Sequence, residues 1–400
     1  MIKNILIISS DHTGHGHKSI TEALCEKFTQ YEDINVKVID GFSLGGKAMI
    51  QVGKSYGPIT RNAKELWKLI WKISLTKPQL IDEAVEIIIK DNLLNVLEQV
   101  KPDLILSVHP NFNGSVLNIM EKSGIRIPFV TLIADLVSIS PHWINLRADW
   151  IISPTHEAKN KCVHFKFPEE KVKILGFPVR SRFYNHRVGY SDKEDRYRQD
   201  KPLKCLIMSG GEGSGNMSKI ASILLENFNC TVKIVAGRNK AARKKLENTL
   251  YGKFGQRAEV YGFVNNIQDL MMSSDIAFTR GSPNVMMEAV SCNVPLVITG
   301  ALPGQEQGNP EFASKYNLGV VCEDLKNLQK TISDLLSDNA FKLNQIKESQ
   351  RQFTNPDTAE NIVNFILSLD IKKEDILYGD NLNPAQVEHY FKTYGDMNGN

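Results

Sequence analysis

Histidines and glycines crowd together directly after the first apolar run of the chain, in the segment SDHTGHGHKS of residues 10–19. Glycines between a strand and a helix allow a tight turn and let a ligand approach the helix N-terminus closely. His17 falls where that helix should begin, and an imidazole there can act as a general base on a hydroxyl group. An ordinary turn with surface histidines explains the segment equally well. A metal site made of His12, His15 and His17 would lack a carboxylate or thiolate to complete it.

Further titratable side chains stand at the ends of later apolar runs. His109 follows one run in SVHP, Asp135 ends another in LIADL, and His142 and Trp143 come shortly afterwards. Each alone is more often structural, as a turn or N-cap residue. Together with His17 they place three titratable groups near one cleft, which is less usual at a merely structural sheet edge.

A glycine-dense loop, SGGEGSGN, follows the apolar run at residues 203–208. Its backbone N–H groups, and the positive end of the helix expected after it, suit a diphosphate. It is not a P-loop, because no Gly-Lys-Ser/Thr follows, and it matches the dinucleotide fingerprint only loosely. The loop predicts a phosphate site at Gly210, Gly211, Glu212 and Gly213.

The densest polar signal lies between residues 262 and 309. Glu288 is expected inside a helix just past a turn, where its carboxylate could accept hydrogen bonds from both hydroxyls of a ribose. Gln305, Glu306 and Gln307 form a cluster flanked by glycines after a predicted strand. Amide and carboxylate side chains in that place suit the hydroxyl groups of a hexose better than they suit a solvated loop.

Short apolar runs alternate with longer amphipathic segments along the whole chain, and this pattern predicts a parallel sheet with helices on both faces. In the first half we expect strands at Ile5–Ser9, Val36–Ile39, Leu104–Val108, Phe129–Ile133 and Trp150–Ser153, with helices at Lys18–Thr29, Asp82–Val100 and Ser115–Lys122. In the second half we expect strands at Leu203–Ser209, Val232–Ala236, Glu259–Tyr261, Ile276–Thr279, Pro295–Thr299 and Gly319–Cys322.

The chain of 400 residues is too long for one compact core. The alternation pauses after residue 179, and the charge-dense stretch at 191–196 indicates a linker. We therefore predict an α/β fold of two Rossmann-like domains, residues 1–185 and 186–372, which face each other across a cleft and are followed by a frayed tail, 373–400.

Composition excludes several classes of protein. The net charge of +3 is low for a nucleic-acid binder. Six cysteines without a C-x-x-C pair suit a reducing compartment. The N-terminal apolar run is too short for a signal peptide, and no apolar stretch reaches the roughly 18–20 residues that span a bilayer, so membrane contact would be peripheral.

The order and spacing of these motifs resemble the family of monogalactosyldiacylglycerol synthases and processive diacylglycerol glucosyltransferases (glycosyltransferase family 28, GT-B fold). The matching segments extend from Asp11 to Asn309 and also include residues 176–180 and 237–239. The family's usual GGGH is GHGH here, at residues 14–17. Its usual TKxGPGT is TRGSPNV, at residues 279–285.

The resemblance implies an inverting, metal-independent transfer of galactose or glucose from a UDP-sugar to the hydroxyl of diacylglycerol, with the UDP-sugar as co-substrate and no cofactor. It implies His17 as the catalytic base, with Asp135 as the competing candidate. His109, His142 and Trp143 would lie near the acceptor. The donor would be bound by Gly210, Gly211, Glu212, Gly213, Arg238, Asn239, Phe263, Val264, Ser282, Pro283, Asn284, Glu288, Gln305, Glu306 and Asn309.

Residues 47–78 are basic and include Trp67 and Trp71 beside Lys64, Lys68 and Lys72. A basic amphipathic helix with tryptophans is typical of the interface of an anionic membrane. We expect these tryptophans to contact lipid on the cytoplasmic side of the cell membrane. A helix packed on its own domain with a solvated lysine edge is the alternative.

Other functions remain open at this point. A GT-B transferase could move N-acetylglucosamine to a different lipid acceptor. A nucleotide-sugar epimerase or an inactive UDP-binding regulator could share the fold. An NAD-dependent oxidoreductase would need an acidic residue about 20 positions after the first glycine loop, and Asp40 lies at such a strand end.

Overall fold

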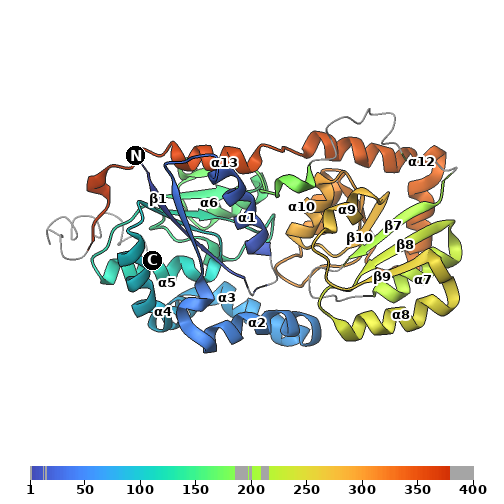
Figure 1. Cartoon of the computed structure of the whole chain (residues 1–400), viewed down its shortest axis with the longest axis horizontal. Coiled ribbons are helices and arrows are strands. Elements are labelled where there is room, and N and C mark those ends of the chain that lie inside the picture. Colours follow the sequence, from blue (N-terminus) through green and yellow to red (C-terminus); the bar gives the residue numbers. More distant parts are fainter. Residues whose placement is uncertain are drawn as a thin grey trace. The chain divides into compact units, whose positions relative to one another are not determined.

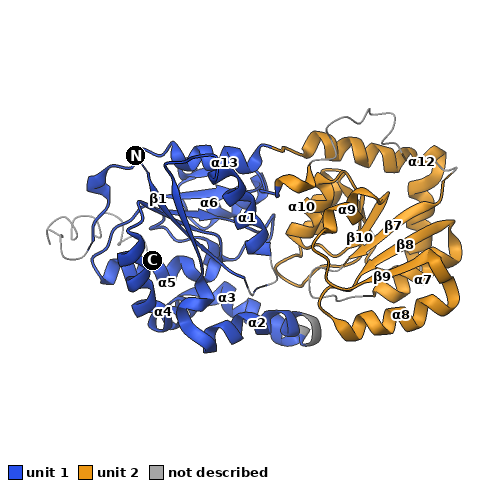
Figure 2. Ribbon diagram, viewed as in Figure 1, with its two compact units in different colours: residues 1–180, 357–400 blue, residues 181–356 orange. Residues whose placement is uncertain are grey.

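The computed structural model describes residues 2–11, 13, 16–184, 197, 201–208 and 216–378. The chain forms two compact units (Figure 2): unit 1 is Met1–Arg180 with Asp357–Asn400, and unit 2 is Ser181–Pro356. The charge-dense stretch at 191–196, expected to be a linker, lies outside the described residues.

Unit 1 is built on a six-stranded parallel sheet with the order β2-β1-β3-β4-β5-β6. Strands β3 and β4 are buried along their whole length, as expected for a parallel sheet covered on both faces. The order reverses between β1 and β3, and ligands of open α/β sheets bind outside the carboxyl ends of the strands at such a switch point. The strands are β1 Asn4–Ser9, β2 Asn35–Asp40, β3 Leu104–Ser107, β4 Phe129–Leu132, β5 Trp150–Ser153 and β6 Val172–Ile174.

The helices of unit 1 include a consecutive series, α2 to α4, between the second and third strands (Figure 1). Helix α4 begins with Pro78 at its first turn, where the missing N–H costs nothing, and it packs closely on α5. The helices are α1 Gly16–Phe28, α2 Gly46–Asn62, α3 Lys64–Thr76, α4 Pro78–Val100, α5 Asn113–Lys122, α6 His156–His164 and α13 Thr358–Leu367.

Unit 2 repeats the architecture with the strand order β12-β11-β10-β7-β8-β9. Its switch point lies between β7 and β10, so the segments that follow these two strands are neighbours. The strands are β7 Leu203–Met208, β8 Cys230–Val235, β9 Ala258–Tyr261, β10 Ile276–Thr279, β11 Leu296–Ile298 and β12 Gly319–Val321. The helices are α7 Met217–Asn227, α8 Lys240–Phe254, α9 Ile267–Met272, α10 Pro283–Ser291, α11 Asn309–Lys315 and α12 Leu328–Phe353.

The C-terminal segment departs from the predicted boundary at residue 372. From Asp357 the chain belongs to unit 1, and α13 packs against α1. The Tyr31 hydroxyl donates to Asn364 Oδ1 at 2.6 Å, and Lys27 pairs with Glu360 at 3.3 Å. Leu377 forms an antiparallel bridge with Arg126. The apolar face of α13 is therefore buried on the first sheet unit, a long-range contact that sequence periodicity does not reveal.

Candidate active site

The loops that follow β1, β3 and β4 bring the predicted catalytic residues of unit 1 together. These strands are adjacent in the sheet, with Ile8 beside Ser107 and Ser107 beside Thr131. Their carboxyl ends therefore lie at one edge of the sheet. His17, His109, Asp135 and Trp143 all gather there.

His17 lies in the first turn of α1, and its Nδ1 is 2.6 Å from the carbonyl oxygen of Val108. A carbonyl can only accept, so Nδ1 carries the proton and Nε2 is left as an acceptor. Burial lowers the pKa of His17 from 6.5 to about 4, against the opposing effect of the Val108 hydrogen bond. The imidazole is therefore neutral at physiological pH, with a basic nitrogen available.

His109 packs directly against His17, with ring centroids 4.4 Å apart. Its Nδ1 accepts from the Asn111 N–H at 3.3 Å, which assigns the proton to Nε2, and Nε2 then donates to the Thr13 hydroxyl at 3.1 Å. Thr13 in turn donates to Ser10 Oγ at 2.8 Å. Burial, followed by the charges of His17 and His142, holds the pKa of His109 well below 6.5. Buried at 4% exposure, it supports the His17 ring rather than presenting itself to solvent.

Asp135 is buried and accepts a hydrogen bond of 2.7 Å from the Trp143 indole N–H. Trp143 is 1% exposed, and its ring lies 6.0 Å from that of His17. The Asn113 amide donates to the carbonyls of His142 and Trp143, which fixes the turn Pro141–Trp143. One oxygen of Asp135 is thus committed to orienting Trp143.

His142 is also buried, and burial lowers its pKa to about 4 despite a hydrogen bond to the backbone of Pro78. Its Nε2 has no hydrogen-bond partner in the described part of the chain. The contact with Pro78 links this edge of the sheet to the start of α4, the helix that follows the basic α3 segment.

In unit 2 the segments after β10 and β11 carry seven of the fifteen predicted donor residues. Glu288 lies in α10 as expected and is 8% exposed. Ser282 and Pro283 begin α10, and Asn284 lies in its first turn. Asn309 is fully buried, and its amide donates to the Gly281 carbonyl at 2.7 Å, which ties the two loops together.

Glu306, predicted to read the sugar, has its carboxylate buried and paired in this structure. It is 3% exposed, receives the Leu302 N–H at 2.8 Å, and pairs with Arg280. Gln305 beside it is partly exposed. Gln305 is therefore partly exposed while Glu306 is buried, a difference that the sequence alone does not predict.

The loops after β8 and β9 hold a second group of predicted donor residues. The Arg238 guanidinium lies over the Phe263 ring at 4.6 Å, and that ring is 51% exposed. Val264 is partly exposed beside it. Asn239 caps α8 by accepting from the Ala242 N–H at 3.0 Å. The glycine loop with Gly210, Gly211, Glu212 and Gly213 lies outside the described residues, as do His12 and His15.

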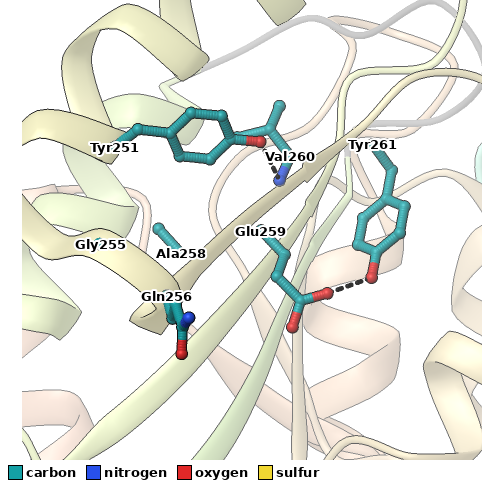
Figure 3. A pocket seen from close by; sticks show the side chains of 7 residues that line it. All are labelled: Tyr251, Gly255, Gln256, Ala258, Glu259, Val260 and Tyr261. Atoms are coloured by element: carbon teal, nitrogen blue, oxygen red, sulfur yellow. Dashed lines mark hydrogen bonds between the residues drawn. The ribbon is translucent and has the colours of Figure 1, made fainter.

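A surface hollow of about 490 Å³ lies along β9 and the C-terminal part of α8 (Figure 3). Tyr251, Gln256, Glu259 and Tyr261 line it, and the Tyr261 hydroxyl donates to the Glu259 carboxylate. This hydrogen bond raises the pKa of Tyr261 to about 12. None of the predicted donor residues lines the hollow, so we do not assign it to the nucleotide.

Trp67 departs from the lipid contact expected from the sequence. It is 8% exposed, because its ring packs edge-on against Tyr56 of α2 at 5.3 Å. Trp71 lies 6.2 Å from Trp67 and is partly buried. The exposed residues of α3 instead include four aliphatic side chains. These are Leu66, Leu69, Ile73 and Leu75, exposed by 41–55%.

Two alternative sites were weighed from the sequence, and the first, a metal site of His12, His15 and His17, includes two residues that lie outside the described part of the chain. Within the described residues no group of three or more His, Cys, Asp or Glu could hold a metal ion. Asp40, the acidic residue that a dinucleotide site would need, caps the turn Gly41–Gly45 by accepting from the Phe42 N–H. Among those same residues no helix is long and apolar enough to cross a bilayer.

Sequence patterns did not reveal the residues that hold the histidines. Ser10 and Thr13 lie in a loop, where small polar residues are common. The Val108 carbonyl belongs to the backbone, so the residue type does not indicate its role. Of the residues that support the histidine site, only Asn113 could have been suspected, because it is an amide among neighbours that are otherwise buried. Such a buried amide must be hydrogen-bonded, and here it holds the Trp143 turn.

Two family models match the chain. The model described as monogalactosyldiacylglycerol (MGDG) synthase matches residues 17–179, and the model described as glycosyl transferases group 1 matches residues 216–338. The first begins at the proposed base and spans the sheet of unit 1 from β2 to β6, and the second covers most of unit 2.

The chain is similar to curated enzymes along most of its length. A probable monogalactosyldiacylglycerol synthase of Glycine max is 27% identical over 379 residues, which cover 90% of this chain and 70% of that protein. A processive diacylglycerol beta-glucosyltransferase of Bacillus cereus is 27% identical over 384 residues, 92% of this chain and 95% of that protein. The crystal structure of MurG from Acinetobacter baumannii aligns over 92% of this chain and 100% of its own, with a TM-score of 0.63 at 13% identity. The GT-B fold of two Rossmann-like units is thereby confirmed.

Proposed function

We propose that this chain, which belongs to the family of MGDG synthases and processive diacylglycerol glucosyltransferases, transfers galactose or glucose from a UDP-sugar to the hydroxyl of diacylglycerol. The observation that carries the chemistry is His17: a neutral imidazole at the switch point of unit 1, with Nδ1 bonded to Val108 and Nε2 left as an acceptor.

In the proposed reaction the acceptor hydroxyl oxygen attacks the anomeric carbon of the donor sugar. The bond from that carbon to the diphosphate oxygen breaks, its electron pair leaves with UDP, and the hydroxyl proton passes to His17 Nε2. Attack opposite to the leaving group inverts the anomeric configuration. Asp135 acts as a positioning residue for Trp143, because its carboxylate already accepts from the indole N–H.

Unit 2 is proposed to hold the donor. Glu288, near the middle of α10, would take the ribose hydroxyls, and Phe263 with Val264 would flank the uracil. The loop of Gly210, Gly211, Glu212 and Gly213 with the start of α7 would hold the diphosphate. Backbone N–H groups and helix N-termini would then stabilise the departing UDP without a metal ion.

The aliphatic face of α3 is proposed to dock on an anionic membrane. Leu66, Leu69 and Ile73 lie three and four residues apart, so they form one stripe, and exposed Lys68 and Lys72 flank it. Aliphatic side chains that enter the acyl boundary, beside lysines that meet acidic headgroups, are the pattern of an interfacial helix. We place this contact on the cytoplasmic side, in keeping with six cysteines of which none forms a disulfide.

The direct test is UDP release in the presence of diacylglycerol liposomes and, separately, UDP-galactose, UDP-glucose and UDP-N-acetylglucosamine. We expect release with one of the two hexose donors that stops when diacylglycerol is omitted. Release with UDP-N-acetylglucosamine alone, or only with a different lipid, would instead support the alternative transferase. Hydrolysis without any acceptor requirement would contradict the proposal.

A further inference from the structure

Helix α8, Lys240–Phe254 (Figure 1), begins with a concentration of positive charge. Between residues 227 and 246 the sequence has six basic residues and no acidic one, although the net charge of the whole chain is only +3. Three of the six, Lys240, Lys244 and Lys245, are exposed residues of α8, and we call them the lysine cluster of α8.

The lysine cluster lies on the face of α8 that points away from the sheet. Leu246 and Leu250 are buried in the core of unit 2, so they define the inward face of the helix. Helical periodicity places the three lysines opposite these two leucines. Ala241, Asn248 and Gly252 share the outward face and are small or uncharged, and a Cβ at Gly252 would meet nothing within 4 Å. The lysine ammonium groups can therefore approach a flat partner without obstruction.

The charges of the lysine cluster are not neutralised by the described part of the chain. The neighbouring Arg243 pairs with Glu247 at 2.8 Å, and Lys253 near the end of the helix pairs with Glu226. No ion pair joins a member of the cluster to any described residue. Two of its members are four residues apart, a spacing at which like charges on a helix repel each other. A negatively charged partner would relieve this repulsion.

The shape of this surface favours an anionic membrane over a single small anion. Three long, flexible side chains on the outward face of a helix do not enclose one phosphate group, but each can reach a different lipid headgroup. Tyr251 lies two turns after Lys244 on the same face and is 45% exposed. Tyrosine rings are enriched at membrane–water interfaces, because they have an apolar body and a polar tip.

We infer that the lysine cluster of α8 is a second membrane contact, which attaches unit 2 to the phosphates of anionic lipids. It differs in kind from the aliphatic stripe of α3, because it acts through charge. Its binding should therefore weaken as salt is added. The inference rests on the proposed function only in taking the acceptor to be a membrane lipid.

The test measures how the full chain sediments with vesicles of phosphatidylcholine alone and with vesicles of which one third is phosphatidylglycerol. The variant Lys240→Gln with Lys244→Gln and Lys245→Gln removes the cluster. We expect it to bind the anionic vesicles at least about tenfold more weakly, since each lysine near an anionic surface contributes about fivefold. At about 0.5 M salt, where charges are screened beyond a few ångströms, the wild-type chain and the variant should bind alike. Both should bind pure phosphatidylcholine equally.

The matched control removes the same number of exposed positive charges from another part of unit 2. It is Lys326→Gln with Lys330→Gln and Lys342→Gln, and it should bind anionic vesicles as the wild-type chain does. The Tm of both triple variants should equal the wild-type value, because the replaced side chains are exposed.

Three outcomes would overturn the inference. The first is wild-type affinity of the cluster variant for anionic vesicles. The second is an equal loss in the control, because net charge alone would then explain the binding. The third is unchanged vesicle binding with a raised KM for the UDP-hexose in neutral micelles, which would assign the cluster to the donor. Sedimentation needs neither donor nor turnover, so a chain that binds vesicles through the cluster but transfers no sugar would contradict the proposed function alone.

Discussion

The imidazole of His17 is useful because its surroundings keep it unprotonated. Its Nδ1 proton is fixed on the Val108 carbonyl, and His109 packs on its ring at 4.4 Å. A positive charge on the imidazole is disfavoured at this edge, because burial removes it from water. His17 is therefore a weaker base than an exposed imidazole, but it stays neutral at every physiological pH.

The first residue-scale prediction concerns the pH dependence of activity. Because the folded pKa of His17 is about 4, its Nε2 stays unprotonated well below the ordinary value of 6.5. The acid limb of the kcat/KM profile should therefore appear near pH 4 to 5 and not near 6.5. Initial rates measured in overlapping buffers between pH 4 and 8 would show this. A half-maximal rate near pH 6.5 would contradict the neutral-base assignment.

Removal of the His17 imidazole should slow the chemical step without changing the affinity for the donor nucleotide. His17→Ala should lower kcat by at least about a hundredfold, the usual contribution of a general base. UDP affinity should stay at the wild-type value, because the proposed donor residues belong to unit 2. Asp135→Asn, which keeps an acceptor for the Trp143 indole, should retain much more activity. If Asp135→Asn were the more damaging of the two, Asp135 would be the base.

At the scale of elements, the buried histidines also make unit 1 sensitive to acid. His17 and His142 both have folded pKa values of about 4, below the 6.5 of an unfolded chain. The unfolded state therefore binds more protons, so the stability they contribute is complete above pH 6.5 and is lost as the pH falls from 6.5 towards 4. Thermal unfolding should show a lower Tm at pH 5 than at pH 7. A His142→Asn variant should show a smaller decrease.

The contact between α4 and α5 depends on a glycine. A Cβ at Gly114 would lie 2.0 Å from Asp82 Oδ2, and burial has already raised the pKa of Asp82 to about 7. Gly114→Ala should therefore destabilise unit 1 by about 1–3 kcal/mol, the range for overpacking, as measured by urea unfolding. Gly252→Ala, where a Cβ meets nothing within 4 Å, is the control and should not destabilise the chain.

Helix α3 should bind lipid through its aliphatic stripe. Leu69→Glu with Ile73→Glu should reduce sedimentation with anionic liposomes strongly, while UDP binding stays intact. Phe341→Glu makes the same kind of change at an apolar residue of unit 2 that is 61% exposed, and should have no effect. Trp67→Phe should also bind liposomes normally, because that ring is packed inside the unit. Unchanged sedimentation of the double variant would rule out this surface.

Much of the fold could be predicted from the sequence, because buried parallel strands leave continuous apolar runs. The predicted bounds of β5 and β10 agree with the structure exactly in residue number, and the other predicted strands differ by at most two residues at either end. Strand β6 was missed, since Lys173 lies between its two apolar residues and leaves no apolar run. The closeness of His17 and His109 was predicted because each follows a strand, and their roles stay predictions. The burial of Trp67 and Glu306 was not predicted, because residue type does not tell which way a side chain points.

At the scale of the whole molecule, the two units are proposed to have different roles. Unit 1 supplies the base and the membrane contact of α3, and unit 2 supplies the nucleotide site. Since the proposed stabilisation of UDP depends on backbone N–H groups and helix N-termini, activity should survive dialysis against EDTA. Loss of activity that magnesium restores would show that the leaving group needs a metal ion.

The most direct measurement is the structure of the lipid product. The chain would be incubated with diacylglycerol liposomes and a UDP-hexose, and the extracted lipid analysed by mass spectrometry and by the NMR signal of its anomeric proton. The account predicts diacylglycerol enlarged by one or more hexosyl groups, with the first in the β configuration opposite to that of the α-linked donor. Unmodified diacylglycerol, or an α-linked product, would contradict it.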